Sequence, residues 1–367
     1  MAARQTWRNA ALGLAAIAVA VAGGAWIKRG DIALNVFRKA VSRNLTGDPI
    51  AQLPDGLHVG LCGTGSPLPD PTRNGPCTAV IAGQRMFVVD AGDGAAKGLT
   101  LMGLSPARAE ALLLTHFHSD HIDGLGGVML QHWGAGASKT PLTVFGPTGV
   151  ESVVQGFVEA YTPDRGYRIA HHGPTVMPPE GFGAVARPFP APPPGGELVL
   201  VEDKDLRVTA FSVNHAPVEP AVGYKFVYKG RSVVISGDTA PSPNVEAAAR
   251  GADLLVHEGL APNLVGIQRD AAEKAGRTNL ARVFHDIPGY HTSPEDAARL
   301  AQRAGVKMLV FTHIVPALPM KPLEKAFLGK APSLYKGRLA VGHDGDFVSL
   351  PAGGEQITLT NRSAMSR

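Results

Sequence analysis

The sequence has little charge, few aromatic residues and only two cysteines. Charged residues make up 18% of the 367 positions, and the basic ones are unevenly distributed along the chain. Seven basic residues fall within the first 43 positions, opposed there only by Asp31, so the rest of the chain is close to neutral. A nucleic-acid-binding domain usually carries a basic patch. The composition shows none, and it gives no support to a polyanion-binding protein.

The two cysteines, Cys62 and Cys77, are too few for a disulfide framework or a structural zinc site. They flank the turn-rich stretch "GTGSPLPDPTRNGP", so one bridge that closes a hairpin is geometrically open. Buried free thiols are nevertheless the favoured prediction, because cysteine is often simply buried.

One apolar run stands at the N-terminus, residues 10–27, "AALGLAAIAVAVAGGAWI". As a helix it would be about 27 Å long, close to the roughly 30 Å hydrocarbon core of a bilayer. Because Arg4 and Arg8 precede it, we predict a signal anchor or signal peptide over residues 1–30. The chain is then membrane-anchored or exported, with the periplasmic side favoured. Residues 31–49 are predicted to form an amphipathic linker.

From about residue 56, short apolar runs bounded by Gly, Pro or Asp recur at strand spacing, for example "LHVGLCG", "MFVVDAG" and "ALLLTHF". Helical stretches at 147–161 and 294–305 interleave with them, and the proline-rich segment 173–197 is predicted to be a surface loop. Alternating strands and helices predict an α/β domain over residues 50–350. Residues 351–367 are predicted to be a C-terminal tail.

A group of potential metal ligands follows one of these runs, in "THFHSDHIDG" at residues 115–124. His116 and His118 share one side in extended backbone, and Asp120 continues that alternation before His121. Imidazoles together with a carboxylate suit Zn²⁺.

Further candidate ligands follow other apolar strands: His215 after "FSVN", Asp238 after "VVISG" and His313 after "MLVFT". Open α/β architectures collect their sites at the carboxyl ends of strands. Seven candidates suffice for two metals if one carboxylate bridges them, so we predict a two-metal hydrolytic centre.

The order "THFHSDH", His215, "SGDT" and His313 resembles the metallo-β-lactamase fold superfamily. The stretch from "GTGSPLPDPTRNGPCTAVIAG" to "FVVDAGDG" is similar to its ribonuclease Z and arylsulfatase-like branch. The resemblance covers roughly residues 57–345 and implies an αββα sandwich with two zinc ions per chain at one edge. It further implies that His116, His118 and His215 hold one zinc, that Asp120, His121 and His313 hold the other, and that Asp238 bridges them. Asp90 would orient a ligand.

Two more motifs resemble ribonuclease Z: "LLVHEG", with His257 and Glu258, and "YHTSPEDAARLAQ", with His291. The resemblance implies that His291 donates a proton and that Glu258 supports it, so that the catalytic residues are Asp120, His291 and Glu258. A surface loop histidine is the alternative for His291.

The remaining histidines receive no catalytic role. His171 and His172 are predicted to be exposed loop residues. "CGTGSP" lacks the lysine and the following helix of a P-loop, so we interpret it as a turn near the metal site. The histidines without companions in the sequence are His58, His132, His285 and His343.

We therefore predict a zinc-dependent hydrolase of a small phosphodiester or sulfate ester that uses a metal-bound hydroxide. Alternatives are a ribonuclease Z-like endoribonuclease for tRNA 3′ processing, and a lactonase or β-lactamase. Ribonuclease Z enzymes usually carry a long arm between the positions of His215 and Asp238, and this chain has no room for one. We therefore do not expect tRNA as a partner. A homodimer of this chain is an alternative that the sequence leaves open.

Two readings from other classes are weaker. Flavodiiron proteins share the superfamily fold, but they have Glu at the position of His118, which favours hydrolysis here. A membrane-tethered binding protein with a vestigial site would not need all seven ligand residues.

Overall fold

The computed structural model describes residues 26 and 28–362. The chain divides into two compact units, Met1–Asp48 and Pro49–Arg367. In the first unit, α2 (Arg29–Thr46) forms in the stretch predicted to be an amphipathic linker. The anchor predicted over residues 10–27 lies outside the described residues, apart from Trp26. Within the described part of the chain, no helix combines the length and apolarity needed to cross a membrane.

Two β-sheets build the second unit, and among the described residues they contain eight and seven strands. The first has the order β15-β14-β1-β2-β3-β4-β5-β6 and the second the order β13-β12-β11-β10-β9-β8-β7. The strands of the first sheet are β1 (Gly56–Gly63), β2 (Cys77–Ala82), β3 (Arg85–Val89), β4 (Ala109–Leu113), β5 (Leu142–Pro147), β6 (Ala184–Phe189), β14 (Asp346–Pro351) and β15 (Thr358–Asn361). Those of the second are β7 (Leu198–Glu202), β8 (Leu206–Ser212), β9 (Val222–Tyr228), β10 (Arg231–Ile235), β11 (Leu254–Leu260), β12 (Met308–Val315) and β13 (Arg338–Val341).

Helices follow many of the strands. Between the strands β3 and β6 of the first sheet, the helices are α3 (Ala95–Leu101), α4 (Ser119–Ile122), α5 (Leu125–Gly136) and α6 (Val150–His172), with 3₁₀ turns at Pro106–Arg108 and Pro179–Gly181. Between the strands β10 and β13 of the second sheet, the helices are α7 (Pro243–Ala248), α8 (Pro262–Lys274), α9 (Thr278–Asp286), α10 (Pro294–Ala304), α11 (Leu323–Leu328) and α12 (Ala331–Leu334), with a 3₁₀ turn at Ile287–Gly289.

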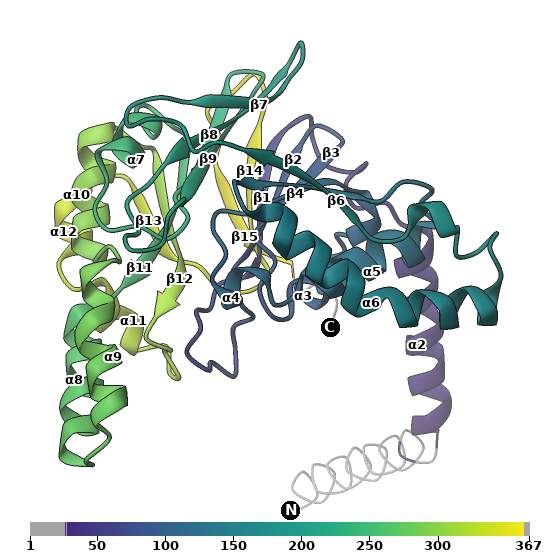
Figure 1. Ribbon diagram of the computed structural model, residues 1–367, viewed down its shortest axis with the longest axis horizontal. Helices are drawn as coiled ribbons and strands as arrows, with labels where there is room; N and C mark the ends of the chain where they lie inside the picture. The colour runs from purple at the N-terminus through teal and green to yellow at the C-terminus, as the bar shows by residue number, and fades with distance from the viewer. Residues whose placement is uncertain (1–25, 27, 363–367) are drawn as a thin grey trace, which may run out of the picture. The chain divides into compact units, whose positions relative to one another are not determined.

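The sheets pack face to face, and helices cover both outer faces. Val59 and Phe87 of the first sheet share one core with Phe226 and Val256 of the second. Residues of α3, α5 and α6 pack on the outer face of the first sheet, and residues of α7, α10, α11 and α12 pack on that of the second (Figure 1). Burial on both sides explains why β1 and β11 are mostly apolar and lack the alternation of a half-exposed strand, since every residue in them is buried. The predicted αββα sandwich is confirmed.

Local boundaries differ from the sequence prediction in three places. The helix expected over 147–161 runs on as α6 to His172, although Pro163 lies inside it. The segment 173–197, expected to be a loop, contributes β6, which pairs in parallel with β5. The predicted C-terminal tail contains β15, which pairs with β14 at the edge of the first sheet. Weak periodicity hides all three, because edge strands and exposed helices bury little apolar surface.

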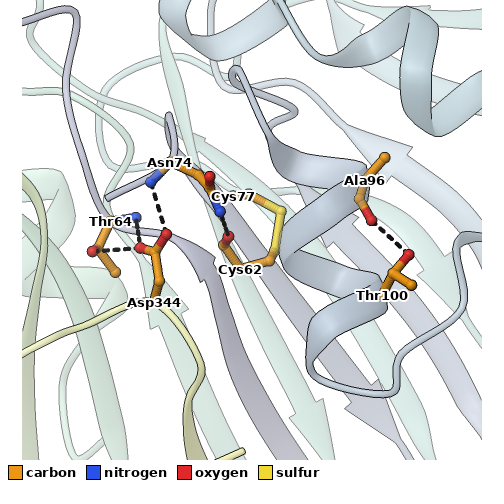
Figure 2. The surroundings of a disulfide bond; sticks show 7 residues. All are labelled: Cys62, Thr64, Asn74, Cys77, Ala96, Thr100 and Asp344. Carbon is orange, nitrogen blue, oxygen red and sulfur yellow. Dashed lines mark hydrogen bonds between the residues drawn. A yellow bond between two sulfur atoms is a disulfide. The ribbon is translucent and has the colours of Figure 1, made fainter. Parts of the chain in front are cut away.

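Cys62 and Cys77 form a disulfide, so the prediction of free thiols is wrong. Antiparallel pairing of β1 with β2 places Gly63 opposite Cys77, and the two cysteine Cα atoms lie 5.0 Å apart. Figure 2 shows how the intervening loop is held: Asp344 accepts hydrogen bonds from the Thr64 and Asn74 N–H groups at 2.9 and 2.7 Å. Asn74 Nδ2 also donates to the Cys62 carbonyl at 3.1 Å. The bridge and Asp344 together hold the loop, whose end at Pro76 and Cys77 borders the same pocket as the candidate ligands Asp238 and His313.

Candidate metal centre

All seven predicted ligands meet in one cluster, because the strands that carry them end at the same edge of the sandwich. Both sheets contribute to it. His116 and His118 follow β4, Asp120 and His121 lie on α4, His215 follows β8, Asp238 follows β10 and His313 lies near the end of β12.

The first group in the cluster consists of three histidines and Asp238. The Nε2 atoms of His116 and His215 lie 2.9 and 3.3 Å from His118 Nδ1. The same two atoms lie 3.9 and 4.0 Å from Asp238 Oδ2. All four potential ligand atoms are within 4.8 Å of one another, so they could hold one ion. Three nitrogens and a carboxylate oxygen form a donor set suited to Zn²⁺.

The second group consists of Asp120, His121 and His313. His313 Nε2 lies 3.2 Å from Asp120 Oδ2 and 3.2 Å from Asp238 Oδ2. His121 Nε2 lies 3.5 Å from Asp120 Oδ2 and 3.3 Å from Asp238 Oδ2. Asp238 Oδ2 therefore faces both groups, which is the place that a bridging carboxylate must occupy.

Asp238 supplies a test of whether the cluster fits metal ions. Its Oδ1 atom is buried and has no hydrogen-bond partner among the described residues. A buried carboxylate oxygen without a partner is costly, so native proteins seldom leave one. A cation between the two groups would neutralise this carboxylate. The residues present thus fit bound metal ions.

Asp90 orients His121 by contacting the ring nitrogen that does not face the cluster. Its Oδ2 atom lies 2.9 Å from His121 Nδ1, and its Oδ1 atom accepts a hydrogen bond of 2.8 Å from the Thr115 N–H. The Thr115 hydroxyl donates to the same carboxylate at 2.9 Å. An Asp90 carboxylate that can only accept keeps the proton of neutral His121 on Nδ1, so Nε2 presents its lone pair to the cluster.

Burial and the carboxylates shift the pKa of His121 and the pKa values of the three first-group histidines in opposite directions. Burial lowers the pKa of His116 well below its usual value, and it also lowers the pKa values of His118 and His215. Burial acts in the same direction on His121, but Asp238, Asp90 and Asp120 outweigh it and raise its pKa well above the usual value. The three imidazoles of the first group are therefore neutral and ready to coordinate. The second lies in a strongly negative potential, which attracts cations.

His291 lies beside the cluster and is held by Glu258. The His291 ring centroid is 5.3 Å from that of His215 and 5.4 Å from that of His313. Its Nδ1 atom lies 3.2 Å from Glu258 Oε1, which also accepts a 2.8 Å hydrogen bond from the Thr292 N–H. Burial lowers the pKa of His291, but Glu258 outweighs this effect and raises it to about 9. The pairing expected from the sequence is present.

The helix that follows His291 begins as its sequence predicts. Ser293 caps α10 by accepting a hydrogen bond from the Asp296 N–H, and Pro294 is its first residue. This rigid start fixes the short segment that carries His291.

The backbone is unusual at two residues of the site. Asp90 and His313 have φ angles of 59° and 46°, a left-handed conformation that non-glycine residues seldom adopt. Such conformations persist where surrounding structure enforces them, often at functional sites. Gly92 serves the same loop, because a Cβ there would come within 2.3 Å of the Asp120 carbonyl oxygen.

Two supporting residues escaped the sequence analysis. Tyr290 holds His215, because its carbonyl oxygen lies 3.0 Å from His215 Nδ1. Thr115 donates to Asp90. Thr115 precedes the candidate ligand His116, and Tyr290 precedes the candidate catalytic residue His291, so adjacency to a candidate site residue was the available signal.

The other histidines lie outside the cluster. His257 is buried, with its Nδ1 atom 2.7 Å from the Glu258 carbonyl oxygen. His171 and His172 are exposed, as predicted, but they end helix α6 rather than lie in a loop. The histidines given no role contact groups elsewhere or lie on exposed surface: His58, His132, His285 and His343.

A two-sheet αββα sandwich with this cluster at the ends of its strands defines a metal-dependent hydrolase. The chain belongs to the metallo-β-lactamase superfamily, whose sequence profile matches residues 70–313, and within it the chain is ribonuclease Z-like. It is 38% identical to the ribonuclease Z of Mycobacterium bovis (strain BCG / Pasteur 1173P2) over 290 residues, which cover 78% of this chain and 96% of the relative. The predicted superfamily and its ribonuclease Z branch are thus confirmed.

Solved structures support the same fold. The chain matches human tRNase Z, short form, with a TM-score of 0.57 and 23% identity over 80% of this chain and 99% of that one. It matches the metallo-beta-lactamase fold protein YhfI from Bacillus subtilis with a TM-score of 0.56 and 17% identity, over 81% of this chain and 100% of that one.

The expectation that tRNA is not a partner is contradicted by these relatives. It rested on the missing arm between His215 and Asp238. The 290 aligned positions take up 78% of this chain, about 286 residues, so the mycobacterial ribonuclease Z has no long insertion that this chain lacks. The missing arm therefore does not separate the chain from a protein of that name.

Proposed function

We propose that this chain is a ribonuclease Z-like endoribonuclease that removes the 3′ trailer of precursor tRNA. The observation that carries the proposal is the match to almost the whole of a ribonuclease Z, together with the full seven-residue cluster. The relatives favour this reading over hydrolysis of a small phosphodiester or sulfate ester, because none of those described above is named for such a substrate.

We further propose that the cluster holds two zinc ions. His116, His118 and His215 would hold one, Asp120, His121 and His313 the other, and Asp238 would contact both. Bound zinc supplies Lewis acidity and lowers the pKa of water from 15.7 to about 7. The neutral imidazoles of the first group and the oriented Nε2 atom of His121 support this assignment.

His291 is the proposed proton donor to the leaving oxygen of the cut phosphodiester. Glu258 Oε1 lies 3.2 Å from its Nδ1 atom, and a carboxylate at this distance stabilises the protonated imidazole. His291 also lies within 4.8 Å of ligand atoms of Asp238 and His313, and a third metal ligand is the competing role. Pairing with Glu258 favours the proton donor, because a protonated imidazole cannot coordinate.

The test incubates the purified, zinc-loaded full-length chain with a precursor tRNA that carries a 3′ trailer. We expect one endonucleolytic cut that releases the trailer, and loss of this cut after zinc is removed with a chelator. Matched reactions contain bis(p-nitrophenyl) phosphate or p-nitrophenyl sulfate. Turnover of a small ester without any cut in the tRNA would reject the ribonuclease proposal and restore the small-ester reading.

A further inference from the structure

A concave surface lies outside the cluster of candidate ligands, where β12 leads into α11 and α12. It is a hollow of about 640 Å³. We call it the lysine hollow. Its lining includes Lys321, Lys325, Lys330, Glu324, Leu328 and Ser333. The three lysines are exposed. In Figure 1, α11 and α12 lie on the same side of the molecule as α8 and α10.

The carboxylates at the lysine hollow are engaged by other groups. Glu324 Oε1 lies 2.9 Å from His343 Nε2. Glu295, which borders the hollow, accepts the Lys330 N–H at 3.2 Å and pairs with Arg299 at 3.3 Å. Within the described residues, no ion pair joins a side chain of Lys321, Lys325 or Lys330 to a carboxylate. The three lysines therefore line the hollow without an ion pair of their own in the described part of the chain, and the one carboxylate in the lining, that of Glu324, contacts His343 instead.

The helices next to these lysines are anchored in the core of the second unit. Phe327 of α11 and Ala331 of α12 are buried in the core of the second sheet. Asn263 of α8 donates a 3.0 Å hydrogen bond to the Ala326 carbonyl. Lys325 lies on α11, Lys321 precedes that helix by two residues, and Lys330 lies between α11 and α12. Three lysines against one glutamate leave the lining with an excess of positive charge, which attracts a multivalent anion.

The lining chemistry selects phosphate groups over bases. The lining residues are Lys, Pro, Glu, Leu, Gly and Ser, without an aromatic ring on which a base could stack. Lysine acts as a point charge toward phosphates and reads no sequence. The occupant that fits is therefore a phosphate backbone.

The hollow is also close enough to the metal cluster to contact the same RNA molecule. Lys321 lies eight residues after His313 in the sequence, so their Cα atoms are at most about 28 Å apart. We propose that the lysine hollow binds the phosphate backbone of the RNA substrate at a distance from the cut. This inference rests on the proposed function, because the RNA that would bind the hollow is the substrate named there.

The test measures binding of a fluorescently labelled mature tRNA, which has no trailer to lose, to the full-length chain at several salt concentrations. In one variant Lys321, Lys325 and Lys330 are all replaced by Ser. Each lost lysine–phosphate contact lowers the slope of log Kd against log salt by about 0.9, so we expect a slope reduced by about 2.7. Affinity at low salt should fall at least about tenfold.

The matched control replaces three exposed lysines elsewhere, Lys139, Lys204 and Lys274, by Ser, with the same change in net charge. We expect it to bind tRNA within about twofold of the unmodified chain. Equal weakening of tRNA binding in both variants, or unchanged tRNA binding in the first variant, would overturn the proposal that the lysine hollow binds RNA. Lysine-dependent binding to anionic lipid vesicles without lysine-dependent binding to tRNA would overturn it as well. A set of Lys→Gln changes at the same three positions repeats the test if the Ser variant folds poorly.

Cleavage of precursor tRNA by the unmodified chain separates the two proposals. If the chain cuts the RNA but the first variant binds it normally, the lysine hollow is wrong and the ribonuclease assignment stands. If the chain does not cut but its tRNA binding still depends on the three lysines, the ribonuclease assignment fails and the binding surface stands.

Discussion

Replacing Asp90 by Asn should weaken zinc binding without removing a proposed ligand. The Asp90 carboxylate accepts from Thr115 at 2.8 Å and lies 2.9 Å from His121 Nδ1. An amide has one oxygen, so it can serve Thr115 or His121 but not both as the carboxylate does. If the NH₂ group faces His121, the proton of the imidazole moves to Nε2 and blocks the lone pair.

The magnitude follows from the loss of one orienting contact. Groups that orient a metal ligand are typically worth 10–100-fold in metal affinity, or about 1.4–2.7 kcal/mol. We expect Asp90→Asn to weaken, by that factor, the zinc that Asp120, His121 and His313 would hold, measured by competition with a chelating dye. Cleavage of precursor tRNA should fall at limiting zinc and recover in part at high zinc.

Asp253→Asn is the matched control. Asp253 is also buried, but it accepts from the Ser232 N–H at 2.9 Å and pairs with Lys307 at 3.1 Å, away from the cluster. Its variant should unfold at a lower temperature and bind zinc as the unmodified chain does. Zinc affinity of Asp90→Asn equal to that of the unmodified chain would refute the orienting role of Asp90.

Three further outcomes follow from the same structure. His291→Ala should lower kcat on precursor tRNA by about 10²–10⁴ while zinc content stays unchanged; a loss of zinc would assign His291 as a ligand instead. Joint replacement of Cys62 and Cys77 by Ala should cost about 3 kcal/mol of unfolding free energy in denaturant titrations, because the bridge closes a loop of 15 residues; no loss would contradict that. Burial lowers the pKa of His58 in the folded chain below its usual 6.5. As the pH falls below 6.5, the unfolded chain binds a proton at His58 before the folded chain does, so the free energy of unfolding decreases. His58→Gln should therefore reduce the loss of stability between about pH 7.5 and pH 5.5, and an unchanged pH dependence would count against this account.

The sequence predicted the cluster well, because each ligand follows an apolar strand whose end is easy to recognise. His116 follows "ALLLT" and Asp238 follows "VVISG", and the strands end together in the fold. The disulfide was missed because Cys62 and Cys77 are brought together by the pairing of β1 with β2, which composition does not reveal.

Two other features depended on context that a local pattern lacks. β15 is a short edge strand in a polar stretch, and only its pairing with β14 makes it visible. The exclusion of tRNA rested on a segment absent between His215 and Asp238. Comparison with the mycobacterial relative shows that a protein named ribonuclease Z also has no long insertion relative to this chain, which the local pattern could not reveal.

Titration of zinc into metal-free, full-length chain, with the rate of precursor tRNA cleavage as the readout, tests the central claim most directly. The account predicts no cleavage without metal and a rate that reaches its plateau at two zinc ions per chain, because the seven residues form two groups joined by Asp238. Cleavage in the absence of metal, or a plateau at one ion per chain, would contradict it.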